Sequence, residues 1–248
     1  MRDLLTAVSY NIHQCVGTDG RRDLKRVAAV IQDMKADIIG LQEVDFNPLG
    51  EKKSHQLDYL AAATGMRAIA GPTFRRADAD FGNALLTSCE ISEVKLHDVS
   101  VSGRQPRGVI DAEIACDGKR VRVLVTHLGL GVNERRRQGQ SLLRIIREQK
   151  ADYDFTLVLG DINEWRPRGF VLYSLNNYLG RIPSPRTFPS FFPVFALDRI
   201  WIKPRTALLQ VKIANHGLAR IASDHLPILA RVNLSTSVPS LAQRSRGR

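Results

Sequence analysis

Short apolar runs that end in polar or acidic residues recur along the whole sequence, and they alternate with amphipathic segments of helical period. Residues 5–10 and 37–44 have the apolar character of buried strands, and residues 23–34 between them carry Leu24 and Ile31 on one helical face. Strands and helices alternate in this way without a linker. The pattern therefore predicts a single α/β domain built around buried sheets.

The same reasoning predicts the other elements. We expect one helix at residues 55–64 and another at about 133–149, with Asn133 as its N-cap. The pair Asp117-Gly118 indicates a tight hairpin turn between two strands. Further strands are expected at residues 67–70, 83–87, 90–99, 108–115, 119–127, 155–159, 196–202, 208–213 and 226–232, with a proline-rich loop at 182–193.

The length and composition are those of an ordinary globular domain. The chain has 248 residues, of which 44% are hydrophobic and 25% charged, so it can bury a substantial core. We expect one domain at residues 1–232 and a flexible basic tail at 233–248, which is rich in Ser, Gln and Arg. No apolar run is long enough to span a membrane, and the first residues lack the apolar segment of a signal peptide.

The three cysteines, Cys15, Cys89 and Cys116, are widely spaced and odd in number. They match no zinc-binding spacing and no disulfide framework, which is typical of a protein in a reducing cytoplasm. We therefore expect a cytoplasmic protein whose cysteines act as small buried hydrophobes rather than reactive thiols.

The charge balance favours anionic partners. Lys and Arg number 36 against 25 Asp and Glu, which gives a net charge of +11. Nucleic acid, phosphorylated small molecules and peripheral contact with an anionic membrane all fit this excess. Residues 119–150 hold nine Lys or Arg against two Glu. This stretch is either a nucleic-acid contact or simply a solvated helix face.

Five strand-like runs end in side chains able to touch a metal ion or a phosphate. Carboxylate and amide oxygens suit a hard cation such as Mg²⁺ or Mn²⁺, which takes only one or two carboxylates and completes its shell with water and phosphate oxygens. Glu43 is the best single ligand candidate, because it ends an apolar strand where a carboxylate has little structural purpose. The five segments are residues 9–13, 41–44, 126–128, 160–163 and 223–227.

Each of these residues also has an ordinary structural explanation. Glu43 alone is more often a solvated charge, and Asn11 or Asn163 could cap a turn. His127 alone is more often a hydrogen-bonded core or surface histidine, and Asp224 could cap the turn before a proline. Only the combination of the segments, in this order, is informative.

That order resembles one known family. Along the chain the motifs are SYNIH, LQEV, GNALLT, PRGVI, THL, GDIN, TFP, LDRI and SDHLP, from about residue 9 to residue 232. In this order they are similar to the motifs of the endonuclease/exonuclease/phosphatase family, which includes deoxyribonuclease I and the abasic-site endonucleases. The resemblance implies an α/β (α+β) four-layer sandwich, in which two packed mixed β-sheets are flanked by helices. It places the active site at one end of the paired sheets.

The resemblance also implies catalytic roles. Asp161 matches the residue that positions or deprotonates the attacking water, and Asn163 a donor to the phosphate in the transition state. His127 matches a histidine that donates to a phosphate oxygen, and His225 a second catalytic histidine. Asp198 of the LDRI motif is expected to hydrogen-bond His225 and fix its tautomer. Together with a cation, these groups would offset the negative charge that builds up on the phosphate.

Ligand and substrate contacts follow from the same matches. Glu43 corresponds to the principal metal ligand of the family, with Asn11 and Asp224 beside it as further metal-side groups. Mg²⁺ is the expected cofactor, with Mn²⁺ as the alternative. Three residues are expected to contact substrate: Arg107, which precedes a strand, and Arg186 and Thr187, which lie in the proline-rich loop. For Asn83 of GNALLT we favour an interior structural role.

Three functional hypotheses remain open at this stage. The leading one is a metal-dependent phosphodiesterase that acts on nucleic acid, although the tyrosine typical of abasic-site endonucleases has no match here. The second is the same chemistry on phospholipid headgroups or small phosphate esters. The third, a non-catalytic binding protein, is disfavoured because both histidines and the whole acidic set are present.

Overall fold

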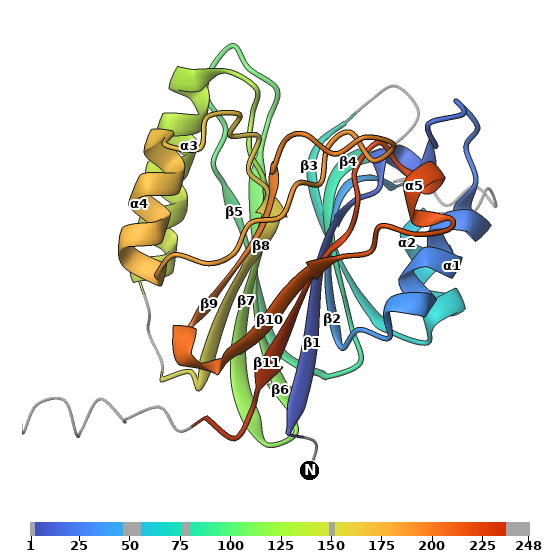
Figure 1. The fold of residues 1–248 in the computed structure, drawn as a ribbon. Coiled ribbons are helices and arrows are strands. Elements are labelled where there is room, and N and C mark those ends of the chain that lie inside the picture. Colours follow the sequence, from blue (N-terminus) through green and yellow to red (C-terminus); the bar gives the residue numbers. More distant parts are fainter. Residues whose placement is uncertain (1–2, 47–55, 76–79, 149–151, 237–248) are drawn as a thin grey trace, which may run out of the picture.

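Two β-sheets packed face to face form the centre of the molecule (Figure 1). The computed structural model describes residues 3–46, 56–75, 80–148 and 152–236. One sheet has the order β10 (Leu208–Ile213), β11 (Ile228–Asn233), β1 (Leu4–Asn11), β2 (Ile38–Phe46), β4 (Asp80–Thr87), β3 (Arg67–Arg75). The other has the order β5 (Glu90–Asp98), β6 (Gly108–Cys116), β7 (Lys119–His127), β8 (Phe155–Asp161), β9 (Asp198–Lys203).

Helices cover the outer face of each sheet, which gives the predicted four layers (Figure 1). On the six-stranded side lie α1 (Leu24–Met34), α2 (Gln56–Thr64) and the short α5 (Ala219–Ala222). On the five-stranded side lie α3 (Val132–Arg147) and α4 (Phe170–Leu179). Two short 3₁₀ turns, η1 (His13–Cys15) and η2 (Arg205–Ala207), complete the described elements. Among the described residues, no helix is long and apolar enough to cross a membrane.

Burial on both faces explains why the central strands are apolar throughout. In β8, Leu157 and Leu159 face the other sheet, whereas Val158 packs beneath α3 and α4. All seven residues of this strand are buried. A strand covered on both sides has no solvent face, so its sequence is continuously hydrophobic rather than alternating. Polar residues at the ends of such strands therefore stand out, because the packing of the strand does not explain them.

Helix ends agree with the sequence in one case and differ in another. Asp23 caps α1 through a hydrogen bond from the backbone N–H of Arg26. The predicted cap of α3 at Asn133 is wrong, because Gly131 holds that position and the Glu134 carboxylate accepts its backbone N–H at 3.1 Å. Helix α4 was not predicted, although its buried residues lie at helical spacing. The turn at Asp117-Gly118 is confirmed, with both residues at positive φ.

The prediction that the chain has no disulfide is also wrong. Cys89 and Cys116 are bonded, with their Cα atoms 5.1 Å apart, and Cys15 is buried and free. The register of β5 and β6 explains the pairing. Glu90 lies opposite Ala115 in this antiparallel pair, so Cys89, just before Glu90, lies opposite Cys116, just after Ala115. The cysteine argument for a reducing cytoplasm therefore no longer holds.

The fold extends slightly beyond the predicted domain boundary. Leu234 is buried, and its backbone N–H donates to the carbonyl of Asp3 at 2.9 Å. Most of the predicted flexible tail, residues 237–248, lies outside the described residues.

Candidate active site

Three neighbouring strands place three predicted catalytic residues in one row. His127 ends β7 and lies opposite Asp161, which ends the parallel strand β8. Asp161 in turn lies opposite Asp198, the first residue of the antiparallel strand β9. Because register fixes these pairs, residues 34 and 37 positions apart in sequence meet at one edge of the sheet. All three are buried.

The carboxylate of Asp161 lies at the centre of the cluster. Its Oδ2 accepts a hydrogen bond from Asn11 Nδ2 at 3.1 Å, across from the other sheet. The same oxygen lies 3.5 Å from His127 Nε2 and 3.7 Å from His225 Nε2. Burial raises the pKa of Asp161 to about 6, against the opposing effect of the His225 cation. The group is therefore a stronger base than an exposed aspartate and is still largely ionised at neutral pH.

Asp198 lies in hydrogen-bonding contact with His225. Asp198 Oδ2 lies 2.8 Å from His225 Nδ1, and both side chains are buried. Burial by itself would lower the pKa of His225, but the carboxylates of Asp198 and Asp161 outweigh it and raise the pKa to about 10. His225 is thus an imidazolium that carries Nε2–H toward Asp161.

The second histidine has the opposite protonation. Arg107 Nη1 lies 3.0 Å from His127 Nδ1. A guanidinium can only donate, so Nδ1 accepts, and the neutral ring carries its proton on Nε2. Burial, followed by the charges of Arg107 and His225, lowers the pKa of His127 well below its usual value. His127 is therefore neutral and presents a fixed Nε2–H.

Asn163 adds a second donor at the same point. Its Nδ2 lies 3.0 Å from His127 Nε2 and donates to the carbonyl of Leu128 at 2.9 Å. Its backbone N–H donates to Asp161 Oδ1 at 2.9 Å, from a left-handed conformation that asparagine tolerates well. The Asn163 amide and the His127 Nε2–H therefore lie side by side, and both can donate to an anionic oxygen once the amide turns its second N–H away from the ring.

An acidic edge borders this cluster. Asn11 Nδ2 also donates to Glu43 Oε1 at 3.3 Å, so one amide nitrogen lies between the Glu43 and Asp161 carboxylates. The prediction that Glu43 ends its strand is wrong. It lies on a bulge in the middle of β2 with φ +58°, a conformation that costs a non-glycine residue about 1 kcal/mol or more. Asp224 is half exposed, and its Oδ1 lies 3.8 Å from His13 Nδ1.

The sequence matches the model of a known protein family. The model described as "Endonuclease/Exonuclease/phosphatase family" matches residues 8–225, a range that contains every residue of the cluster. The chain belongs to the endonuclease/exonuclease/phosphatase family. Members of this family are hydrolytic phosphoesterases.

Relatives extend over nearly the whole chain. The Escherichia coli (strain K12) protein YbhP, described as uncharacterized, is 30% identical over 243 residues, which covers 92% of this chain and 95% of that protein. Among solved structures, a Beutenbergia cavernae endonuclease/exonuclease/phosphatase has a TM-score of 0.74 at 20% identity and covers 94% of this chain and 72% of its own.

Two further solved structures carry more specific names. A Bacteroides thetaiotaomicron mannosyl-6-phosphatase has a TM-score of 0.73 at 18% identity, with 91% of this chain and 98% of that one covered. TDP2 from D. rerio, in complex with a single strand DNA product, has a TM-score of 0.68 at 19% identity, with 94% and 100% covered. At such low identity these likenesses establish the family fold and leave the substrate open.

The donor set of the acidic edge fits a hard cation of the kind that the family typically uses. Glu43, Asp161 and Asp224 offer carboxylate oxygens, and their neighbour Asn11 adds an amide group. Asp161, Asp198 and His225 also have ligand atoms within 4.8 Å of one another. We interpret that trio as a hydrogen-bonded relay, because Asp198 is fully buried and its Oδ2 is taken by His225.

The predicted substrate residues fall in three different places. Arg107 contacts His127, so it lies inside the cluster. Arg186 is exposed and lines a separate pocket beside β9. Thr187 is fully buried, and its hydroxyl accepts a hydrogen bond from the backbone N–H of Asp198 at 3.4 Å. That geometry favours a positioning role for Thr187 over the predicted substrate contact. Asn83 donates to the carbonyl of Gly108, which agrees with an interior structural role.

Two supporting residues escaped the sequence reasoning. Ser223 Oγ donates to the carbonyl of Asn11 at 2.7 Å and accepts the backbone N–H of His225 at 3.2 Å, so it ties β1 to the histidine loop. Its place in the SDHLP motif was the available signal. Arg135 is buried and donates to the carbonyl of Gly129, which fixes the loop after His127. Because it stands within a run of arginines, no local sequence pattern distinguished it.

The basic stretch at 119–150 is mainly structural in the part that the structure describes. Arg122 is buried and forms a two-pronged ion pair with Asp111 at 2.7 and 2.8 Å. Arg120 pairs with Glu113, and Arg136 lies over the ring of Phe170. These contacts favour a structural role over a dedicated nucleic-acid contact, although buried Arg122 on β7 does not belong to the solvated helix face of the alternative interpretation.

Proposed function

We propose that this protein hydrolyses phosphodiester bonds in nucleic acid by water attack, with the help of a divalent cation of the Mg²⁺ type. The observation that carries the proposal is the position of the Asp161 carboxylate. It lies within 3.1–3.7 Å of Asn11, His127 and His225, which come from three separate segments of the chain. A buried base next to a neutral and a charged histidine is suited to activating water beside an anion.

Each group has a distinct role in this proposal. Asp161 accepts a proton from the attacking water, because its raised pKa makes it a competent base near neutral pH. His127 Nε2–H and Asn163 Nδ2–H donate to a non-bridging phosphate oxygen. His225, held charged by Asp198, offsets negative charge on the transferring phosphate.

The cation site that we propose consists of Glu43, Asn11 and Asp224, beside Asp161. A bound Mg²⁺ or Mn²⁺ would neutralise phosphate charge there. The left-handed backbone at Glu43 supports this assignment, because strained conformations persist where function requires the side chain in one place.

The charge balance supports a polyanionic substrate. The net charge of +11 favours nucleic acid over a neutral ester. Binding that depends on phosphate contacts releases counterions, so KM should rise steeply with salt concentration. A small phosphate ester with a single phosphate would show a weaker dependence.

Exposed apolar side chains favour a second candidate function, hydrolysis of phospholipid headgroups. Phe191 and Phe192 are 62% and 68% exposed, in the loop whose Ser190 donates to the carbonyl of Asp224. Leu130 is 68% exposed, in the loop that follows His127. Apolar side chains at the rim of a basic protein can insert at a membrane surface.

One experiment separates these candidates. Purified protein with Mg²⁺ or Mn²⁺ is incubated with plasmid DNA, RNA, bis-p-nitrophenyl phosphate and anionic phospholipid vesicles. Glu43→Gln and His225→Ala are compared with His216→Ala, a histidine whose side chain is 69% exposed. We expect cleavage of nucleic acid that falls about 100-fold or more in the first two variants and is unchanged in the third. Cleavage of vesicles alone would favour the second function, and equal activity in all variants would refute both.

A further inference from the structure

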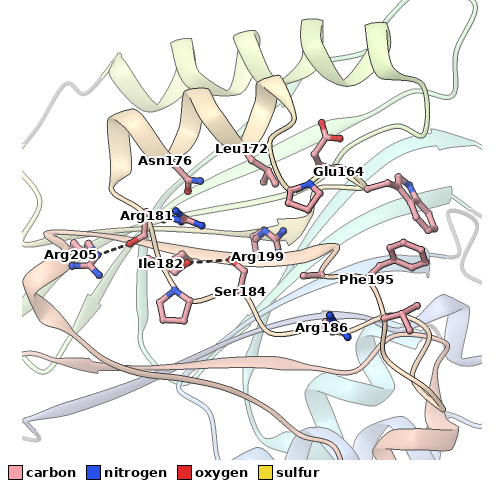
Figure 2. A pocket seen from close by; sticks show the side chains of 15 residues that line it. Glu164, Leu172, Asn176, Arg181, Ile182, Ser184, Arg186, Phe195, Arg199 and Arg205 are labelled. Atoms are coloured by element: carbon pink, nitrogen blue, oxygen red, sulfur yellow. Dashed lines mark hydrogen bonds between the residues drawn. The ribbon is translucent and has the colours of Figure 1, made fainter.

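A second basic site lies beside the catalytic cluster, on the other side of β9. A pocket of about 620 Å³ opens between β9, α4 and the proline-rich segment. Asp198 points from β9 into the cluster, whereas the next residue, Arg199, lines this pocket (Figure 2). His127, Asp161 and His225 are not among the residues that line it. The pocket is therefore distinct from the catalytic centre, although only one strand separates them.

Arg199 is a buried cation without a paired anion. Its residue is only 6% exposed, and its Nη1 donates to the carbonyl of Asp198 at 3.3 Å. No carboxylate of the described residues lies within ion-pair distance of it. Glu164, the acidic residue of the lining, already interacts with Arg135 Nη2 at 3.5 Å and with the backbone N–H of Arg166 at 3.2 Å. Burying an unpaired charge is unfavourable unless something else compensates it.

Three more arginines line the same pocket. Arg181, Arg186 and Arg205 are exposed, and Figure 2 shows them around Arg199. Arg205 Nε donates to the carbonyl of Arg181 at 2.6 Å, which holds these two residues together. Within the described part of the chain, none of the three forms an ion pair. Four guanidinium groups against one engaged carboxylate make the pocket strongly electropositive.

The chemistry of the donors specifies the ligand. Guanidinium groups present planar pairs of N–H donors that match phosphate oxygens. Burial lowers the pKa of Arg199 to about 10, so the group stays charged at neutral pH. An aromatic wall closes the side nearest the catalytic centre, where Trp165 and Phe195 pack edge to face at 4.8 Å. Beyond it, Phe188 lies 4.8 Å from the His225 ring.

We propose that this pocket is a second phosphate-binding site, centred on Arg199 and assisted by Arg181 and Arg205. Its ligand is a phosphate group, carried either by a distal part of the substrate or by a free phosphate compound. The site needs no metal ion, because its donors are all cationic. It therefore stands whether or not the catalytic proposal holds.

The binding test uses the full-length protein with excess EDTA, where the carboxylates around Asp161 should repel an anion. Inorganic phosphate is titrated in by calorimetry. We expect one saturable site whose Kd rises about tenfold in Arg199→Gln. The double variant Arg181→Gln/Arg205→Gln, altered only at exposed positions, should weaken binding about threefold even if Arg199→Gln folds poorly. The matched control is Arg231→Gln, an exposed arginine on β11, which should bind as wild type does.

Two results would overturn the proposal. One is the absence of saturable phosphate binding in EDTA. The other is binding that survives in the arginine variants but disappears in His225→Ala, because the anion would then occupy the catalytic centre.

A kinetic arm identifies the source of the phosphate. If it belongs to the substrate, Arg199→Gln should raise KM about tenfold for a 5′-phosphorylated dinucleotide but leave KM for bis-p-nitrophenyl phosphate unchanged. If it is a free ligand, added inorganic phosphate should alter wild-type turnover of bis-p-nitrophenyl phosphate and have no such effect in Arg199→Gln.

Discussion

Asp198 Oδ2 lies 2.8 Å from His225 Nδ1, and both groups are buried beside the start of β9. The pair forms because β9 starts opposite the end of β8, which brings Asp198 next to Asp161 and beneath the histidine loop. A buried carboxylate behind an imidazole fixes both its orientation and its charge. The charge on His225 is thus a consequence of strand register.

Replacing Asp198 by Asn should therefore lower the pKa of His225. In the metal-free wild-type protein, burial opposes the charge, but Asp198 and Asp161 raise this pKa to about 10. Without the Asp198 carboxylate we expect titration at a clearly lower pH, measured by NMR of the ring protons in EDTA. A ring that remains charged to the same pH in Asp198→Asn would contradict the assignment.

The same pair predicts how stability depends on pH. The folded-state pKa of His225 lies above its ordinary value of 6.5, so its protonated ring stabilises the fold fully below pH 6.5. That stabilisation should be lost as pH rises toward 10. Urea unfolding of the metal-free protein across this interval should show a smaller decline in Asp198→Asn than in wild type.

Arg107 is predicted to act through His127. Replacing it by Met removes the donor to Nδ1, so the imidazole loses its fixed tautomer, and kcat should fall about 10- to 100-fold. It also removes one cause of the low His127 pKa, and the acidic limb of the kcat profile should move to higher pH. Arg104→Met, an exposed neighbour, is the control. A lower kcat with an unmoved pH profile would indicate only a structural role.

Glu43→Gln should weaken cation binding without unfolding the protein. Glu43 is half-buried at a bulge, and the amide keeps its size but removes the charge that attracts the cation. Mn²⁺ affinity, followed by electron paramagnetic resonance, should drop about tenfold or more. Asp58→Asn, an exposed carboxylate in α2, should bind Mn²⁺ as wild type does.

The Cys89–Cys116 bond predicts a redox-dependent stability. It closes a loop across 27 positions, so its removal should lower the free energy of unfolding by about 3 kcal/mol. Cys89→Ser or dithiothreitol should therefore reduce Tm, and Cys15→Ser provides a comparison at a cysteine that is already free. If reduction leaves Tm unchanged in wild type, the bond contributes nothing to the fold.

Much of the fold could be predicted because buried strands and helices have recognisable hydrophobic patterns in the sequence. Strands such as β8 are apolar on both faces, and the acidic or amide residues after them, such as Asp161, stand out against that background. The motif order then indicated the family. The meeting of Asp198 and His225 was expected from the motifs, and the structure places the two in contact.

Other features depend on register and packing, which single segments do not reveal. The disulfide required the pairing of Glu90 with Ala115, which no local pattern contains. The bulge at Glu43 lies inside a strand that appeared to end there. Thr187 looked available in a loop but is buried behind Asp198. Arg199, hidden beside the LDRI aspartate, became notable only once its face of β9 was known.

The most direct test of Asp161 as the catalytic base is the Mg²⁺-dependent hydrolysis of a short oligonucleotide by Asp161→Asn. This change keeps the size of the central side chain and removes its basicity, whereas the surrounding donors Asn11 and His127 remain. We predict that kcat falls about 100-fold or more with nearly unchanged KM and circular dichroism. Wild-type turnover in this folded variant would contradict it.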